Sequence, residues 1–192
     1  ASGGGTRTGY FSRTEESADG RTLHFEHTEL ADGRVVRMLA GTAHAGTGLQ
    51  PEALFALPEA KRVALPADTI FPMAAWSDLL ARLEAGERTV GYVIFDGWSG
   101  AVPDRLRIWA TPLADGAATV GAPGVEMPTG PSWHLDSAYF RHGSSDTEPA
   151  ATAEERLHAG GVSSTIVFDW GLYAVRATLR ESEPLPAPEC DR

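Results

Sequence analysis

The 192-residue sequence contains a single cysteine, a single lysine and no long hydrophobic run. A helix that crosses a bilayer needs roughly 18 or more consecutive apolar residues, so the sequence predicts no transmembrane segment. The 26 acidic residues outnumber the 16 basic ones and give a net charge of −10. Because the basic residues are also scattered along the chain, they offer no clustered surface for nucleic-acid phosphates. The composition therefore argues against nucleic-acid binding.

The lone cysteine, Cys190, lies near the C-terminus after a proline-rich stretch, which is an unusual place for a core or catalytic thiol. The chain begins at Ala1 without an initiator methionine and without the charged and apolar segments of a signal peptide. We therefore expect that a leader has been removed or that the chain is part of a longer protein.

Turn-forming residues are abundant, with 21 glycines and 13 prolines but no collagen-like period. Hydrophobic residues make up 42% of the sequence, which is enough for one sizeable core. We therefore expect one domain with many turns and not a helical bundle.

Three segments rich in β-forming residues lie in the first fifty positions, and Asp-Gly pairs separate them. An Asp-Gly pair between such segments strongly favours a β-hairpin, because glycine tolerates the positive φ of tight turns. In the second segment Leu23, Phe25 and His27 alternate with His24 and Glu26, which is the period of a half-buried strand. We predict an antiparallel meander over residues 8–17, 21–30 and 34–44.

One segment has helical periodicity and predicts the main α-helix at about 72–85. Its apolar side chains recur at steps of three and four residues: Met73, Trp76, Leu79, Leu80 and Leu83. Pro72 suits a first helical turn, Gly86 suits the C-terminal stop, and Asp68 or Thr69 is the expected N-terminal cap. We expect the apolar stripe to pack against a sheet as part of the core.

The remaining β-rich segments are short and are separated by glycine-containing turns: residues 53–65, 88–95, 105–112, 117–121, 132–140, 162–169 and 172–183. Pro58 interrupts the first of these and predicts an edge strand or two short ones. Residues 149–157 are compatible with a short helical turn. About ten short strands around one helix predict an all-β barrel or curled sheet, not a doubly wound fold.

The sequence shows no catalytic or metal-binding constellation. The string Gly97-Trp98-Ser99-Gly100 lacks the spacing of a nucleophile elbow. His24 and His27 point to opposite faces of a strand, whereas one metal ion needs donors that converge. The glycine-rich stretches lack the context of phosphate-binding loops. We predict no catalytic residue, no metal site and no cofactor, although groups that converge only in three dimensions leave no such signature.

Two blocks of the sequence resemble a known family. The first comprises the string Leu65-Pro66-Ala67-Asp68-Thr69-Ile70-Phe71-Pro72, the helix that follows it and Phe95-Asp96-Gly97. The second comprises Gly160-Gly161-Val162, Asp169-Trp170-Gly171-Leu172-Tyr173 and the segment from Leu179 to Cys190. In order and spacing, these motifs resemble the EipB-like cell-envelope integrity family of alphaproteobacterial periplasmic proteins.

The resemblance implies a mainly β fold, in which a curled antiparallel sheet (a β-spiral) is open but barrel-like. It implies one β-spiral domain over residues 1–192 that lacks the family's first N-terminal strands. It also implies a periplasmic location and a disulfide of Cys190, whose partner is absent from this chain. The residues that match the family's structural motifs are Phe71, Pro72, Asp96, Gly97, Gly161, Asp169 and Gly171.

For function, the resemblance implies a non-enzymatic periplasmic protein that supports cell-envelope integrity as a binding or scaffolding module. An envelope protein or lipoprotein would be its partner. One alternative is a carrier of a lipid or lipoprotein acyl chain in the concave face of the sheet, and another is an uncharacterised hydrolase. A filled interior would favour scaffolding, an empty apolar cavity would favour carriage, and a polar constellation would favour catalysis.

Two further expectations concern surfaces. Five tryptophans are candidates to line a groove, although each one alone is more typical of core packing: Trp76, Trp98, Trp109, Trp133 and Trp170. The protein is expected to be a monomer or a dimer formed through an exposed sheet edge, since an unpaired edge invites pairing with another chain.

Overall fold

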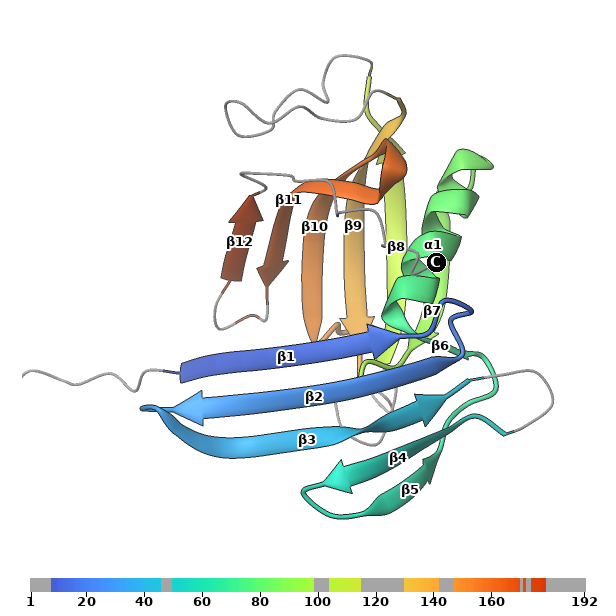
Figure 1. The fold of residues 1–192 in the computed structure, drawn as a ribbon. Helices are drawn as coiled ribbons and strands as arrows, with labels where there is room; N and C mark the ends of the chain where they lie inside the picture. The colour runs from blue at the N-terminus through green and yellow to red at the C-terminus, as the bar shows by residue number, and fades with distance from the viewer. Residues whose placement is uncertain are drawn as a thin grey trace, which may run out of the picture.

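The computed structural model describes residues 8–45, 50–98, 104–114, 130–141, 147–169, 171 and 174–178. These residues form two β-sheets and one α-helix, α1 (Pro72–Glu84) (Figure 1). Sheet A has five strands in sequential order: β1 (Thr8–Glu16), β2 (Thr22–Ala31), β3 (Arg34–His44), β4 (Glu52–Leu57) and β5 (Lys61–Ala64). Sheet B has seven strands, in the spatial order β12 to β6: β6 (Thr69–Ile70), β7 (Thr89–Ile94), β8 (Asp104–Pro112), β9 (Ser132–Phe140), β10 (Ala151–His158), β11 (Val162–Asp169) and β12 (Ala174–Thr178).

Sheet A contains the antiparallel meander that the sequence predicts. The turn between β2 and β3 has positive φ at both Asp32 and Gly33, +50° and +77°, as a tight hairpin requires. Leu23, Phe25 and His27 are buried at alternate positions of β2. The region interrupted by Pro58 forms two short strands, β4 and β5. One face of sheet A therefore packs on a core and the other faces solvent.

Sheet B is antiparallel except at β6 and β7, which pair in parallel because α1 connects them. The strands of sheet A run across those of sheet B, and the two sheets leave the fold open (Figure 1). The predicted open, mainly β fold with one main helix is confirmed. What the sequence presents as one curled sheet is divided into two within the described residues.

Residues 149–157 do not form the helical turn with which their sequence is compatible. Residues 151–158 form β10, which pairs with β9 on one side and β11 on the other. Alanine, glutamate, arginine and leucine favour helices, yet Ala151, Ala153 and Leu157 are buried in the alternating pattern of a strand. Pairing on both sides overrides the local propensity. The predicted strand at residues 117–121 lies outside the described residues.

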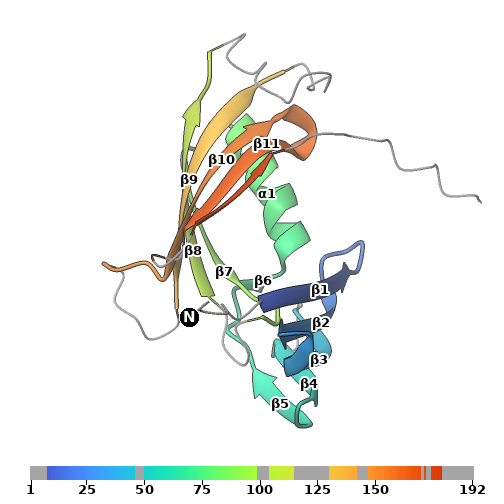
Figure 2. The same ribbon diagram turned by 90° about the vertical axis from the view of Figure 1, so that its left-hand side faces the viewer.

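α1 lies against one face of sheet B and closes the larger hydrophobic core (Figure 2). Leu79 and Leu83 of the helix pack against buried side chains of β7 to β10: Val90, Leu106, Ile108, Ala110, Trp133, Leu135 and Leu157. Met73 is 63% exposed, so its predicted place in the buried stripe is wrong. At 3.6 residues per turn, Met73 lies roughly 100° around the helix axis from Leu79 and Leu83.

A second hydrophobic core joins the two sheets. Phe25 and Phe55 come from sheet A, whereas Phe71 lies directly before α1 and Phe95 directly after β7. All four side chains are at most 4% exposed. The relative position of the sheets therefore depends on aromatic packing at this junction.

The N-terminus of α1 is capped by a strand residue distant in sequence. The carboxylate of Glu16, the last residue of β1, accepts hydrogen bonds of 2.8 Å from the N–H groups of Met73 and Ala74, the second and third residues of the helix. The predicted caps, Asp68 and Thr69, are wrong, because Thr69 lies in β6 and Phe71 occupies the N-cap position. A carboxylate there satisfies free N–H groups and interacts favourably with the helix dipole. Glu16 thus ties sheet A to α1.

We expect Glu16→Ala to lower the free energy of unfolding by about 1–2 kcal/mol, since it removes two charge-assisted hydrogen bonds at the helix N-terminus. Glu15→Ala is the matched control, because the Glu15 carboxylate pairs with exposed Arg13 and this exposed pair should contribute less than about 0.5 kcal/mol. Urea denaturation of both variants measures the difference. Equal losses would show that Glu16 does not act as a cap.

Candidate functional site

The two sheets meet at a seam formed by Phe95-Asp96-Gly97, the segment directly after β7. The ring of Phe95 lies edge-on to Phe25 and Phe55, with centroids 5.8 Å and 6.4 Å away. Gly97 has a φ of +79°, and a Cβ atom at this position would lie 2.4 Å from the Phe25 ring. Both the backbone conformation and the lack of space therefore require glycine here.

His27 of β2 ties the same segment to β1. Its Nε2 atom lies 2.9 Å from the carbonyl oxygen of Asp96, and its Nδ1 atom lies 2.9 Å from the hydroxyl of Ser12. A carbonyl only accepts, so Nε2 donates to it, and in the neutral ring Nδ1 accepts from Ser12. The Asp96 carboxylate accepts a 2.8 Å hydrogen bond from the N–H of Trp98 and closes a tight turn. The seam is therefore a packed and hydrogen-bonded joint.

A buried polar cluster lies at the other end of sheet B. His158 is 0% exposed, and its ring nitrogens lie 3.2 Å from the hydroxyl of Ser132 and 2.9 Å from that of Ser164. A β-bulge makes Ser164 the extra residue of β11, which brings its hydroxyl to His158. The sequence gives no sign of this cluster, because strand pairing alone brings Ser132 and Ser164 to His158. The cluster satisfies buried polar groups and presents no exposed nucleophile.

Burial changes the protonation of groups on β9 and β10. Burial, with a smaller contribution from the positive charge of Arg156, lowers the pKa of His158 below its ordinary value of 6.5. Burial also raises the pKa of Glu155, although the Ser163 hydroxyl donates to its carboxyl group. Burial and nearby negative charges raise the pKa of Tyr139 to about 12. His158 is therefore neutral in the folded protein at neutral pH.

We expect the free energy of unfolding to decrease as the pH falls below about 6.5, because the unfolded state then binds the His158 proton more readily than the folded state does. The raised pKa of Glu155 acts in the opposite direction and stabilises the folded state as the pH falls. The effect of His158 is therefore measured by comparing variants that all retain Glu155. The free energy of unfolding is measured at pH 7.5 and at pH 5, values chosen to bracket roughly the ordinary histidine pKa. It should change less between these pH values in His158→Gln than in the exposed control His24→Gln. Equal pH dependence in the two variants would contradict the assignment.

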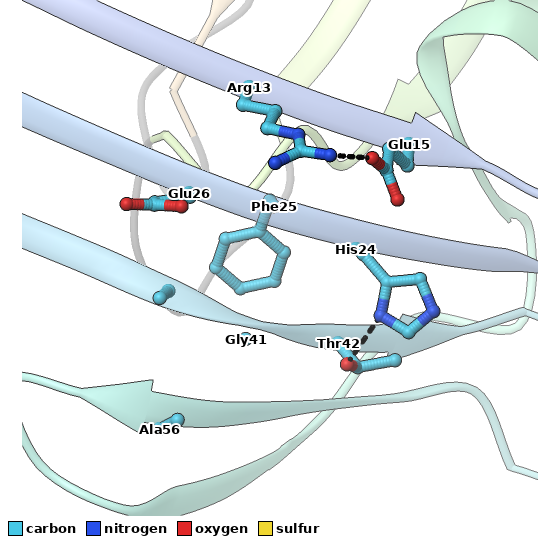
Figure 3. Close-up of a pocket in the computed structure, with 9 residues that line it drawn as sticks. Arg13, Glu15, His24, Phe25, Glu26, Gly41, Thr42 and Ala56 are labelled. Atoms are coloured by element: carbon cyan, nitrogen blue, oxygen red, sulfur yellow. Dashed lines mark hydrogen bonds and ion pairs between the residues drawn. The ribbon is translucent and has the colours of Figure 1, made fainter.

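A hollow of about 400 Å³ lies on the face of sheet A that bears His24 and Glu26 (Figure 3). We call it the β1–β4 hollow, because its lining comes from these four strands. Arg13 and Glu15 form an ion pair at its margin, and the Nδ1 atom of His24 lies 2.9 Å from the hydroxyl of Thr42. Most of its polar side chains are thus already paired with one another.

A second hollow, of about 350 Å³, lies on sheet B, and we call it the β9–β12 hollow. Most of its lining belongs to the face opposite α1, since His134 and Arg156 alternate with residues that pack on the helix. Its residues are His134, Glu154, Glu155, Arg156, Thr165, Val167 and Arg176. Both hollows are therefore open, and each has a mixed polar and apolar lining.

Among the described residues, no group of three or more histidine, cysteine, aspartate or glutamate side chains could hold a metal ion. The described chain also contains no helix that is long and apolar enough to cross a membrane.

Comparison with known proteins identifies the family. A sequence model of the EipB-like family matches residues 1–186. The chain belongs to the EipB-like family. Its structure is similar to the crystal structure of a β-barrel-like protein from Brucella abortus that is assigned to a domain of unknown function. The TM-score is 0.77 at 21% identity, over 91% of this chain and 72% of that chain, so the likeness shows the fold. No curated protein matches the sequence.

In this EipB-like chain, the motif residues singled out in the sequence occupy three places. Phe71, Asp96 and Gly97 meet at the seam, and Pro72 is the first residue of α1. Gly161 lies beside α1, where the indole N–H of Trp76 donates a 3.4 Å hydrogen bond to its carbonyl oxygen. At the end of β11, the Asp169 carboxylate accepts a 2.6 Å hydrogen bond from the N–H of Gly171. These residues hold turns and joints in place.

The tryptophans of the EipB-like chain do not gather at one groove within the described residues. Trp133 is 2% exposed in the core under α1, whereas Trp109 is 41% exposed on the opposite face of sheet B. Trp76 is half-buried beside that core, and Trp98 contacts His27 at the seam. Trp170 and Cys190 lie outside the described residues.

Proposed function

We propose that this EipB-like protein is a non-enzymatic periplasmic protein that supports cell-envelope integrity as a binding or scaffolding module. The observation that carries the proposal is the match of the EipB-like family model over residues 1–186, because the resemblance to that family implies a role in envelope integrity. The similar protein from Brucella abortus is assigned to a domain of unknown function and suggests no reaction.

The distribution of filled and open space supports a binding module over a lipid carrier. The face of sheet B beneath α1 is filled by leucine, isoleucine, valine and tryptophan side chains. Charged side chains contribute to the lining of both hollows, and such side chains suit a polar partner surface. The complete burial of His158 supports a non-enzymatic role over a hydrolase. An envelope protein or lipoprotein is the proposed partner.

Deletion of the gene in its source bacterium tests the proposed role. We expect the deletion strain to become sensitive to detergent, and an exported copy of the protein to restore resistance. The matched control is the same chain without an export signal, which should accumulate in the cytoplasm and fail to restore resistance. Unchanged sensitivity in the deletion strain would overturn the envelope role. Equal rescue by the cytoplasmic copy would overturn the periplasmic location.

Lipid extraction separates the binding module from the carrier. Protein purified from a membrane-containing host should yield no stoichiometric lipid by mass spectrometry. About one lipid per chain would replace the proposal with the carrier alternative, because a carrier must enclose its acyl chain in an apolar cavity of several hundred Å³, on the order of known ligand pockets.

A further inference from the structure

Two arginine side chains line the β9–β12 hollow from strands on either side of β11. Arg156 belongs to β10 and lies opposite Thr165, whereas Arg176 belongs to β12 and lies opposite Val167. Neighbouring strands are about 4.8 Å apart, so β10 and β12 are separated by about 10 Å. Two arginine side chains are long enough to reach one ligand held above β11. The hollow therefore offers two cationic groups from opposite sides.

Neither guanidinium group is neutralised by a partner among the described residues. Within the described part of the chain, the side chains of Arg156 and Arg176 form no hydrogen bond and no ion pair. Other arginines of the protein do form such pairs, as Arg62 does with Glu52 and Arg82 with Asp78. In a protein with 26 acidic residues, two unpaired guanidinium groups in one hollow are available to an external anion.

The acidic side chains of the hollow do not cancel this charge. Glu154 is the exposed carboxylate, and it faces two guanidinium groups. Glu155 is half-buried, its carboxyl group accepts a hydrogen bond from the Ser163 hydroxyl, and burial raises its pKa. Its negative charge is therefore less available to the arginines than that of Glu154. Two guanidinium groups therefore lie in the hollow with one exposed carboxylate, that of Glu154.

We propose that the β9–β12 hollow binds a phosphate group through Arg156, Arg176 and the hydroxyl of Thr165. Guanidinium groups match phosphate oxygens with parallel N–H donors. A tetrahedral phosphate presents more acceptor oxygens than a planar carboxylate does, so it can accept from two guanidinium groups and a hydroxyl from different directions at once. The inference stands apart from the proposed envelope role, because it depends only on the chemistry of this face of sheet B.

Calorimetric titration of the purified protein with inorganic phosphate tests the site. At an ionic strength held constant with chloride, we expect saturable binding of one phosphate per chain. Arg156→Gln and Arg176→Gln should each weaken binding about tenfold, because each removes charge-assisted hydrogen bonds. Glu154→Gln should tighten binding about threefold, because it removes the opposing charge. These two opposite effects at one hollow distinguish a site from general charge attraction.

Arg34→Gln is the matched control, since Arg34 is an exposed arginine on β3 of sheet A and its substitution changes the net charge equally. It should leave phosphate binding unchanged. Three results would overturn the proposal: no saturable binding to the wild type, equal weakening by Arg34→Gln, or acetate binding as tight as phosphate binding. Circular dichroism confirms that each variant is folded, and exposed substitutions of this kind seldom affect stability.

Vesicles identify the source of the phosphate group. The protein is sedimented with vesicles of phosphatidylcholine alone and with vesicles that also contain phosphatidic acid. Sedimentation only with phosphatidic acid, lost in Arg176→Gln and retained in Arg34→Gln, supports the site and assigns its ligand to a lipid headgroup. Titratable binding of inorganic phosphate without sedimentation supports the site and assigns its ligand to a soluble phosphate compound.

Discussion

The Phe95→Ala variant is expected to lose about 4 kcal/mol of unfolding free energy, within the range of roughly 3–5 kcal/mol for buried phenylalanine. Phe95 is 2% exposed and contacts Phe25 and Phe55 edge-on in the core that joins the sheets. Truncation to alanine removes these contacts and leaves a cavity between elements that belong to different sheets. The backbone of Phe95 also donates to Ile70 of β6, which limits the collapse that could refill the cavity.

Phe11→Ala is the matched control for Phe95→Ala. Phe11 is the same residue type in an ordered strand, but it is 53% exposed on β1. Its truncation should cost less than about 1 kcal/mol, since little apolar surface is returned to water. Urea denaturation followed by circular dichroism measures both variants. If the two losses agree to within about 1 kcal/mol, the junction core does not hold the sheets together.

Local patterns account for much of the fold. The three- and four-residue spacing from Trp76 to Leu83 predicts α1 almost to its observed ends, because core packing of a helix requires that period. The alternation of Leu23, Phe25 and His27 predicts the buried face of β2. The Asp32-Gly33 pair predicts the β2–β3 turn, since both residues adopt positive φ. Each of these signals is complete within a few residues of sequence.

Features that depend on distant partners could not be predicted in this way. Glu16 caps a helix that begins more than fifty residues later, so no local capping motif records it. β10 is built from helix-forming residues, and only its two neighbouring strands make it a strand. His158 meets Ser164 because a bulge adds one residue to β11. The amino-acid composition of the strand does not indicate where such a bulge occurs. Long-range pairing decides each case.

The candidate sites show the same division. The string Phe95-Asp96-Gly97 stands out in sequence, but its role depends on Phe25 and His27, which lie about seventy residues earlier. The two arginines of the β9–β12 hollow carry no motif at all, and they become neighbours only because β11 aligns β10 with β12. Sequence motifs therefore locate the joints of this fold better than its binding surfaces.

Gly97→Ala is expected to cost about 3 kcal/mol, the sum of two separable effects. The residue has a φ of +79°, which penalises any side chain by about 1–2 kcal/mol. The new Cβ atom would also lie 2.4 Å from the ring of Phe25, and overpacking of this kind typically costs about 1–3 kcal/mol. The buried ring has no free space to move away, because Phe55 and Phe95 contact it.

Gly33→Ala isolates the backbone effect. Gly33 has a nearly equal φ of +77°, but no atom lies within 4 Å of an added Cβ. Its substitution should therefore cost only about 1–2 kcal/mol, and the difference between the variants measures packing against Phe25. Phe25→Leu provides a second check: a smaller side chain should relieve the clash, so the double variant with Gly97→Ala should lose less than the sum of the single losses. Equal losses for the two glycines, together with additive losses in the double variant, would mean that the ring yields without cost. In that case the positive φ alone, and not the close approach of sheet A, would require glycine at position 97.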